Sequence, residues 1–244
     1  MSLLWHRGSA LSDQRVADAL AEAAVSGVAS GMTIGLGAGA TAARGIKALA
    51  DRVREQNLEI KCVAASDATE GVAREHGLEL IEFALVEELD LLIDGADEVD
   101  RNLNVMKGSR GAVTRERMLA WASRHTVFMV GENKVSEQIG TKTSLAVAVM
   151  AFGLASIRAA LRDLGLNGVC RREMNGDLFV TDNGNLLLDL SLRGDENLSE
   201  LAAALNDIPG VVDHGLFLCE ADEILIETGR GAVERLARED EAGA

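Results

Sequence analysis

The stretch MTIGLGAGAT, residues 32–41, runs from a short apolar segment into a glycine-rich turn. Residues 42–54 follow with helical spacing, because Ile46, Leu49 and Val53 fall on one face. A strand, a glycine-rich turn and a helix in this order are typical of parallel α/β sheets. The alternation continues along the chain, so we predict further strands at 60–64, 78–83, 89–93 and 126–130, and helices at 12–29 (capped by Ser12), 69–76 and 106–124.

The order of predicted elements changes after residue 143. We predict strands at 145–152, 168–172, 186–192 and 211–217, and helices at 154–164 and 198–205. This βαββαβ order is typical of a ferredoxin-like α+β unit. Segments 223–226 and 231–237 are predicted to return to the main sheet. The expected α/β protein therefore has a Rossmann-like parallel-sheet domain, residues 1–143 plus 218–244, and a smaller ferredoxin-like domain, residues 144–217.

Composition and motif content disfavour several classes of function. The net charge is −15, and the chain has no Tyr, 2 Trp and 5 Phe, which disfavours nucleic-acid binding. No apolar run reaches the ~18 residues of a membrane span, and residues 1–8 do not resemble a signal peptide. Three cysteines without metal spacing predict a reduced, cytoplasmic protein without structural zinc. Hydrolase and zinc-protease motifs are absent from the sequence.

Three motifs offer polar chemistry. The first is the turn that contains Gly37, Gly39 and Thr41, where a helix N-terminus favours an anion. Its G-x-G-x-G spacing differs from the G-x-G-x-x-G dinucleotide fingerprint, so NAD binding is disfavoured. From the residues alone, an anion site and a tight structural turn are about equally well supported.

The second motif, IDGADE at residues 93–98, sets Asp94, Asp97 and Glu98 directly after a buried strand, with Gly95 in the turn. Sites of open α/β sheets gather at the carboxyl ends of strands. Crowded carboxylates there repel one another, which a fold alone does not require. We therefore favour a functional site over a solvated acidic turn.

The third motif joins Lys107-Gly108 to Glu116 on the following predicted helix. A carboxyl group held near neutral pKa beside an ammonium suits proton transfer next to a carbonyl. Taken alone, however, the segment favours an exposed Glu–Lys surface.

The three motifs together resemble the type A ribose-5-phosphate isomerase family, from about residue 12 to about residue 231. The most specific block is IDGADE with Lys107-Gly108 and then Thr114-Arg115-Glu116. VTDNGN at 180–185 is similar to a second family signature, and IPGVV at 208–212 with GLF at 215–217 to a third.

The resemblance implies an isomerase that interconverts ribose 5-phosphate and ribulose 5-phosphate through an enediolate, as a homodimer or homotetramer without metal or cofactor. By position, Glu116 resembles the base that moves the proton between C1 and C2, and Asp94 the carboxylate that helps to open the sugar ring. Asp97 resembles the hydrogen-bonding partner of Asp94. Lys107 resembles the cation that steadies the oxyanion, and Lys134 a lysine that reaches the substrate. The remaining substrate-binding positions that the resemblance implies are Gly37, Gly39, Thr41, Gly95 and Gly108.

The chain departs from the family pattern around the expected phosphate site. The family's loop usually reads G-x-G-T-G-S-T, but Ala38 and Ala40 stand at its Thr and Ser positions. Ser109 and Arg110 interrupt a run of glycines, and an early lysine is missing near Ala17. The forked guanidinium of Arg110 would offset these losses if it points inward. Three functions remain open: this isomerase, an isomerase of another or unphosphorylated sugar, and a non-catalytic sugar-phosphate binding protein.

Overall fold

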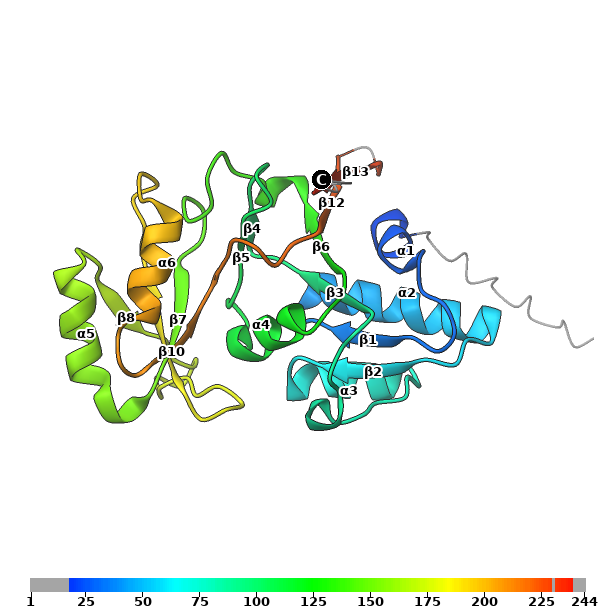
Figure 1. Cartoon of the computed structure of the whole chain (residues 1–244), viewed down its shortest axis with the longest axis horizontal. Coiled ribbons are helices and arrows are strands. Elements are labelled where there is room, and N and C mark those ends of the chain that lie inside the picture. The colour runs from blue at the N-terminus through cyan, green and yellow to red at the C-terminus, as the bar shows by residue number, and fades with distance from the viewer. Residues whose placement is uncertain (1–17, 230, 239–244) are drawn as a thin grey trace, which may run out of the picture.

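The larger unit of the molecule is built on a six-stranded sheet (Figure 1). The structure is a computed structural model that describes residues 18–229 and 231–238. Neighbouring strands of this sheet are parallel, except that β13 runs antiparallel to β12. Its order is β13 (Val233–Ala237), β12 (Glu223–Glu227), β6 (Thr126–Gly131), β3 (Leu91–Gly95), β1 (Thr33–Leu36) and β2 (Lys61–Ala64).

The helices of this part confirm most of the predicted alternation. They are α1 (Ala19–Val25), α2 (Ala40–Gln56), α3 (Asp67–Glu75) and α4 (Val113–Trp121). The Asp18 carboxylate caps α1 by accepting from the Ala21 amide, whereas the predicted cap Ser12 lies outside the described residues. Apolar side chains of α1, α2 and the central strands share one buried cluster that includes Leu20, Ile46 and Ile93.

Two predictions in this part are wrong. Segment 78–83 forms no strand: only Leu80 bridges Cys62, and a short 3₁₀ helix, Phe83–Leu85, follows. The chain must leave the sheet edge there, because β3 lies on the other side of β1 from β2. The predicted helix 106–124 is helical only over α4, since Gly108 and Gly111 adopt φ values of +107° and +87° that a helix excludes.

The second unit is a four-stranded antiparallel sheet in the order β10 (Val211–His214), β7 (Leu145–Val149), β9 (Leu186–Leu190) and β8 (Gly168–Cys170). With α5 (Leu154–Asp163) and α6 (Leu198–Asn206), it has the predicted βαββαβ order. Both helices lie on the side away from the larger sheet, and α4 packs on the opposite side (Figure 1).

The predicted strand 211–217 divides at Gly215. Residues 211–214 form β10, but β11 (Leu216–Phe217) joins β5 (Val105–Met106) and β4 (Glu98–Val99) in a third, small sheet. A Cβ at Gly215 would lie 2.2 Å from the Lys107 carbonyl oxygen, so only glycine fits this crossing. The Lys107 amide in turn donates to the Gly215 carbonyl at 2.9 Å.

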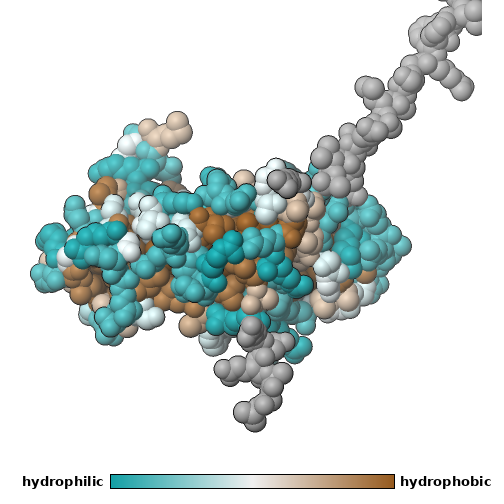
Figure 2. All heavy atoms as spheres, turned by 90° about the horizontal axis from the view of Figure 1, so that it is seen from above, coloured by the Kyte–Doolittle hydropathy of each residue, from teal (hydrophilic) through white to brown (hydrophobic). Residues whose placement is uncertain are grey.

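Arg117 connects α4 to the four-stranded sheet and to the small sheet of β11. Its guanidinium contacts Asp213 of β10 at 2.6 Å and pairs with Glu220. It also donates to the carbonyls of His214 and Leu216, and lies 4.1 Å from the Phe217 ring centroid. In the view of Figure 2, hydrophilic residues cover much of the surface, and hydrophobic residues show between them near the middle.

Candidate active site

Asp94 lies near the carboxyl end of β3 and is fully buried. Its Oδ1 accepts hydrogen bonds from the amides of Ala38 at 3.1 Å and Gly95 at 2.7 Å. A Cβ at Gly37 would lie 1.9 Å from the Asp94 carboxyl carbon. The glycine at position 37 therefore allows the turn after β1 to approach this carboxylate.

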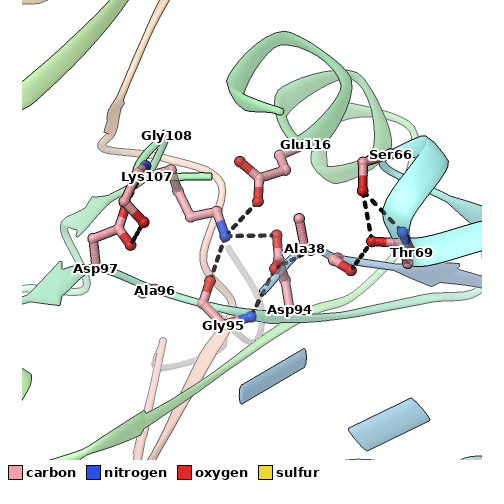
Figure 3. Close-up of polar contacts among 12 residues, drawn as sticks. Ala38, Ser66, Thr69, Asp94, Gly95, Ala96, Asp97, Lys107, Gly108 and Glu116 are labelled. Carbon is pink, nitrogen blue, oxygen red and sulfur yellow. Dashed lines mark hydrogen bonds and ion pairs between the residues drawn. The ribbon is translucent and has the colours of Figure 1, made fainter. Parts of the chain in front are cut away.

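Lys107 follows β5 and points its ammonium between two carboxylates (Figure 3). Nζ lies 2.9 Å from Asp94 Oδ2 and 2.9 Å from Glu116 Oε1, and it also donates to the Gly95 carbonyl. Burial disfavours the charge, but the Asp94 and Glu116 carboxylates outweigh it and raise the pKa of Lys107. The side chain is only 3% exposed, so the ammonium acts where water screens little.

Glu116 lies in the first turn of α4 and is 2% exposed. One carboxylate oxygen contacts Lys107, and the other, Oε2, forms no hydrogen bond within the described part of the chain. Burial raises the pKa of Glu116 to about 7; the Lys107 ammonium opposes the rise and the Asp94 carboxylate adds to it. A buried carboxylate with an unbonded oxygen and a near-neutral pKa has the properties of a general base.

Asp97 and Lys134 lie on the same pocket as Lys107 and Glu116. The Asp97 carboxylate accepts from the amide of Ser109 at 2.9 Å and from its hydroxyl, so its observed partner is Ser109. Lys134 Nζ donates to the Ala96 carbonyl. Partial burial is the main cause that lowers the pKa of Lys134.

The glycine-rich turn forms the opposite wall of this pocket. Gly39 has φ +98° and is the N-cap residue of α2, where it brings no side chain to cap the first turn. The Thr69 hydroxyl donates to the Gly37 carbonyl at 3.1 Å and fixes the turn from α3. The structure thus brings together the residues predicted for the site; the residues that line the pocket include Gly39, Thr41, Gly95, Asp97, Lys107, Gly108, Glu116 and Lys134.

Comparisons with known proteins agree with this arrangement. The family model described as ribose 5-phosphate isomerase A (phosphoriboisomerase A) matches residues 61–231. This chain belongs to that family. It is 42% identical over 206 residues to ribose-5-phosphate isomerase A of Sphingopyxis alaskensis, covering 84% of this chain and 89% of the relative. It is 41% identical over 215 residues to the Roseiflexus sp. protein of the same name, covering 88% and 92%.

Solved structures of ribose 5-phosphate isomerases share the fold. The Methanocaldococcus jannaschii protein superposes with a TM-score of 0.84 at 32% identity, covering 90% of this chain and 96% of that chain. A D-ribose-5-phosphate isomerase in complex with phospho-erythronic acid gives a TM-score of 0.86 at 30% identity, covering 91% and 97%. The family and the α/β fold with its antiparallel second unit, both predicted from the sequence, are confirmed.

Glu98, the third carboxylate of the IDGADE motif, faces away from the pocket of this isomerase-family chain. Its oxygens accept from the amides of residues 140–143 and from the hydroxyls of Thr141 and Thr143. These bonds lower its pKa although burial works in the opposite direction. Glu98 therefore positions the loop at residues 140–143, whereas Asp94 and Asp97 of the same motif lie at the site.

Sequence reasoning missed the polar contacts of the tip at residues 181–185. Asp182 Oδ2 accepts from the Asp67 amide at 3.0 Å, and Arg115 Nε donates to Asn183 Oδ1 at 2.7 Å. Arg115 also pairs with Asp67 at 2.9 Å. The VTDNGN signature marked the tip, but nothing local in the sequence identified its partners on α3 and α4.

No helix within the described residues is long and apolar enough to cross a membrane. The same part of the chain contains no group of three or more His, Cys, Asp or Glu side chains suited to hold a metal ion.

Proposed function

We propose that this chain interconverts ribose 5-phosphate and ribulose 5-phosphate through an enediolate, with Glu116 as the base. One observation carries the proposal. The buried Lys107 ammonium lies 2.9 Å from both Asp94 and Glu116, while Glu116 Oε2 remains without a hydrogen bond at the wall of a pocket. A single carboxylate so placed can remove a proton from one carbon and return it to the neighbouring carbon.

The proposed steps balance without a redox partner. Glu116 takes the proton from C2 of the open-chain aldose, and the C2–H electrons move into the enediolate. The same carboxyl group then gives the proton to C1, while a proton moves from the C2 hydroxyl oxygen to the C1 oxygen. Lys107 supplies fixed positive charge beside the developing oxyanion, which is worth several kcal/mol where water is excluded.

The other predicted site residues keep in this proposal the roles that the family resemblance implies. Asp94 assists ring opening before the proton transfer. Asp97, tied to Ser109, lines the pocket beside it. Lys134 reaches the substrate from the end of β6. The turn of Gly37, Gly39 and Thr41, with Gly95 and Gly108, leaves room for the sugar phosphate to approach the backbone.

The two alternative functions are less well supported. A non-catalytic binding protein has no use for a buried base with an unbonded oxygen, and keeping one costs desolvation energy. An isomerase for an unphosphorylated sugar is disfavoured by the family relatives and by the related structure that holds phospho-erythronic acid.

The test replaces Glu116 with Gln, which keeps the shape and removes the base. Turnover of ribose 5-phosphate in a coupled assay should fall at least about a hundredfold, while substrate still binds in calorimetry. Glu200→Gln on the exposed surface of α6 is the matched control and should leave turnover unchanged. Near-normal turnover in Glu116→Gln would show that another group is the base.

Three broader expectations belong to the same proposal. We propose a homodimer or homotetramer in the cytoplasm, and a division of the chain into 1–143 plus 218–244 and 144–217. The sheet memberships support the division, since β7 to β10 all come from the middle segment. Size-exclusion chromatography with light scattering would measure the assembly, and limited proteolysis the boundaries.

A further inference from the structure

A phosphate group in the pocket requires positive charge, and the two pocket lysines already have partners. Lys107 Nζ is shared between Asp94 and Glu116, and Lys134 Nζ donates to the Ala96 carbonyl. Ala38 and Ala40 bring no hydroxyl groups to the turn. Among the residues that the structure describes, the donors on the glycine-rich side are therefore backbone amides and the Thr41 hydroxyl, unless a further cation reaches this end.

Arg110 extends along the glycine-rich turn. A Cβ built on Gly39 would lie 3.4 Å from Arg110 Cγ and 3.7 Å from Arg110 Nε, so the arginine side chain passes directly over this glycine. Arg110 lines the pocket of Lys107 and Glu116. It also lines an adjoining hollow whose lining includes Gly37. It stands at the junction of the two, beside the first turn of α2.

The Arg110 guanidinium forms no ion pair or hydrogen bond with any residue between 18 and 238 that the structure describes. Neighbouring arginines are paired: Arg115 with Asp67, Arg117 with Asp213 and Arg171 with Asp189. The adjoining hollow contains Asp182, whose carboxylate is bonded to Arg115 and to the Asp67 amide.

The backbone that carries Arg110 is held in place on both sides. Ser109 bonds to Asp97 through its amide and hydroxyl. Arg171 Nη1 donates to the carbonyls of Gly108 at 2.8 Å and Ser109 at 3.0 Å, and the Gly111 amide donates to Gly108 at 3.1 Å. A guanidinium on such a fixed turn loses little backbone entropy when it binds an anion.

We propose that Arg110 binds the phosphate group of the substrate and replaces the two hydroxyls that Ala38 and Ala40 lack. The identity of the sugar rests on the proposed function, whereas the binding of a phosphate anion by Arg110 does not. A guanidinium presents paired N–H donors that fit two phosphate oxygens at once, whereas an ammonium acts as a point charge. Arg110 is thus a specificity residue for the phosphorylated substrate and takes no part in proton transfer.

The experiment compares wild type with Arg110→Ala and Arg110→Lys. In Arg110→Ala, KM for ribose 5-phosphate should rise about 10- to 100-fold, the scale of one or two charge-assisted hydrogen bonds, with kcat and the melting temperature nearly unchanged. The Kd of inorganic phosphate from calorimetry should rise in parallel. KM and the phosphate Kd of Arg110→Lys should lie between those of wild type and Arg110→Ala, because lysine keeps the positive charge but lacks the paired N–H donors of the guanidinium.

Two further variants sharpen the test. Arg162→Ala removes an exposed arginine of α5 and should change neither KM nor phosphate affinity. Adding Ala38→Thr and Ala40→Ser to Arg110→Ala should recover part of the lost affinity, because the new hydroxyls supply donors at the same place. A recovery no larger than the gain in the wild-type background would mean that Arg110 and the turn act independently, which contradicts the replacement.

The outcomes separate this inference from the function. If the wild-type protein is an active isomerase and Arg110→Ala has the same KM and phosphate Kd, the proposed role of Arg110 is wrong. The proposed function is then unaffected. A parallel fall of kcat and melting temperature with unchanged phosphate Kd means that Arg110 is structural, which also overturns it. If the wild-type protein shows no isomerase activity but Arg110→Ala loses phosphate binding, the proposed isomerase function is wrong and Arg110 is still an anion-binding residue.

Discussion

Glu116 illustrates at the scale of one residue how burial makes a base. The carboxylate enters a site where two other charges, Asp94 and Lys107, already balance each other. A third buried charge is disfavoured, so burial raises the pKa of Glu116 to about 7. The side chain can then exchange a proton near neutral pH, which an exposed glutamate with an ordinary pKa does inefficiently.

The first prediction at this scale concerns the pH dependence of activity. Because the base must be ionised in the free enzyme, kcat/KM for ribose 5-phosphate should fall about tenfold per pH unit below pH 7. The measurement is a coupled assay from pH 5 to 9, corrected for the stability of the coupling enzymes. A plateau that continues down to pH 5 would contradict a raised pKa for the catalytic carboxyl group.

The second prediction concerns stability. A carboxyl pKa raised by folding means that the native state binds the proton more tightly than the unfolded state. Its stabilising contribution is therefore complete below the unfolded value of about 4.5 and is lost as pH rises to about 7. Glu116→Gln should raise the free energy of unfolding by about 1–3 kcal/mol at pH 8.

The same substitution should change stability little at pH 4.5, where the native glutamate is protonated, and this pH serves as the internal control. Urea denaturation at the two pH values measures the difference. A destabilised variant at pH 8 would mean that the Glu116–Lys107 contact contributes more to folding than the burial of the third charge costs.

At the scale of elements, the segment between β8 and β9 acts as a strap. It leaves the four-stranded sheet and places Asp182 and Asn183 against Asp67 at the start of α3 and Arg115 of α4. Phe179 of the same segment packs directly on Gly111, because a Cβ at that glycine would lie 2.4 Å from the Phe179 ring. The strap therefore covers the hollow beside the glycine-rich turn.

A third prediction tests this strap. Asp182→Ala removes the acceptor of the Asp67 amide but touches mostly exposed groups, so global stability should change by less than about 1 kcal/mol. Local opening should become more frequent, and the amides of Asp67 and Phe179 should exchange with solvent about tenfold faster. Asp177→Ala, in the exposed turn at residues 173–177 of the same segment, is the control.

Mass spectrometry of hydrogen exchange reads this outcome directly. Equal exchange at Asp67 in the Asp182 variant and wild type would mean that the strap is held by Phe179 and its apolar neighbours, without help from the Asp182 contact.

At the scale of the whole molecule, α4 shares a buried apolar cluster with the six-stranded sheet, and its Arg117 contacts the four-stranded sheet. Its guanidinium has two carboxylate partners and two carbonyl partners beyond its own helix, and packs on the Phe217 ring. The partner carboxylate of Asp213 is buried, and burial raises its pKa, although Arg117 opposes this. Removing the arginine leaves a buried carboxylate without its cation.

The last prediction follows from that loss. Arg117→Met should lower the free energy of unfolding by about 3 kcal/mol, because breaking a buried pair leaves the remaining charge uncompensated. Arg124→Met, which breaks an exposed pair with Glu88, should cost less than about 1 kcal/mol. Denaturant titrations of both variants give the comparison, and equal losses would show that Arg117 contributes no more than a surface pair.

The sequence by itself determined the fold class, the family and the residues to expect in the site. Apolar periodicity identified β1, β3 and β6, because strands buried on both faces are apolar throughout. The resemblance to the isomerase family assigned Asp94, Lys107 and Glu116 to one site, and Asp94 also follows a buried strand, where the sites of open α/β sheets gather.

Only the tertiary structure decided what each polar group faces. Local patterns do not contain the partner of a side chain, which comes from residues far away in the chain. Glu98 belongs to the same acidic motif as Asp94, but its carboxylate binds the loop at 140–143. The break at Gly215 depends on the Lys107 carbonyl. Arg110 became a specificity residue because the turn of Gly108 and Gly111 directs it over Gly39, and backbone dihedral angles of this kind are settled by packing.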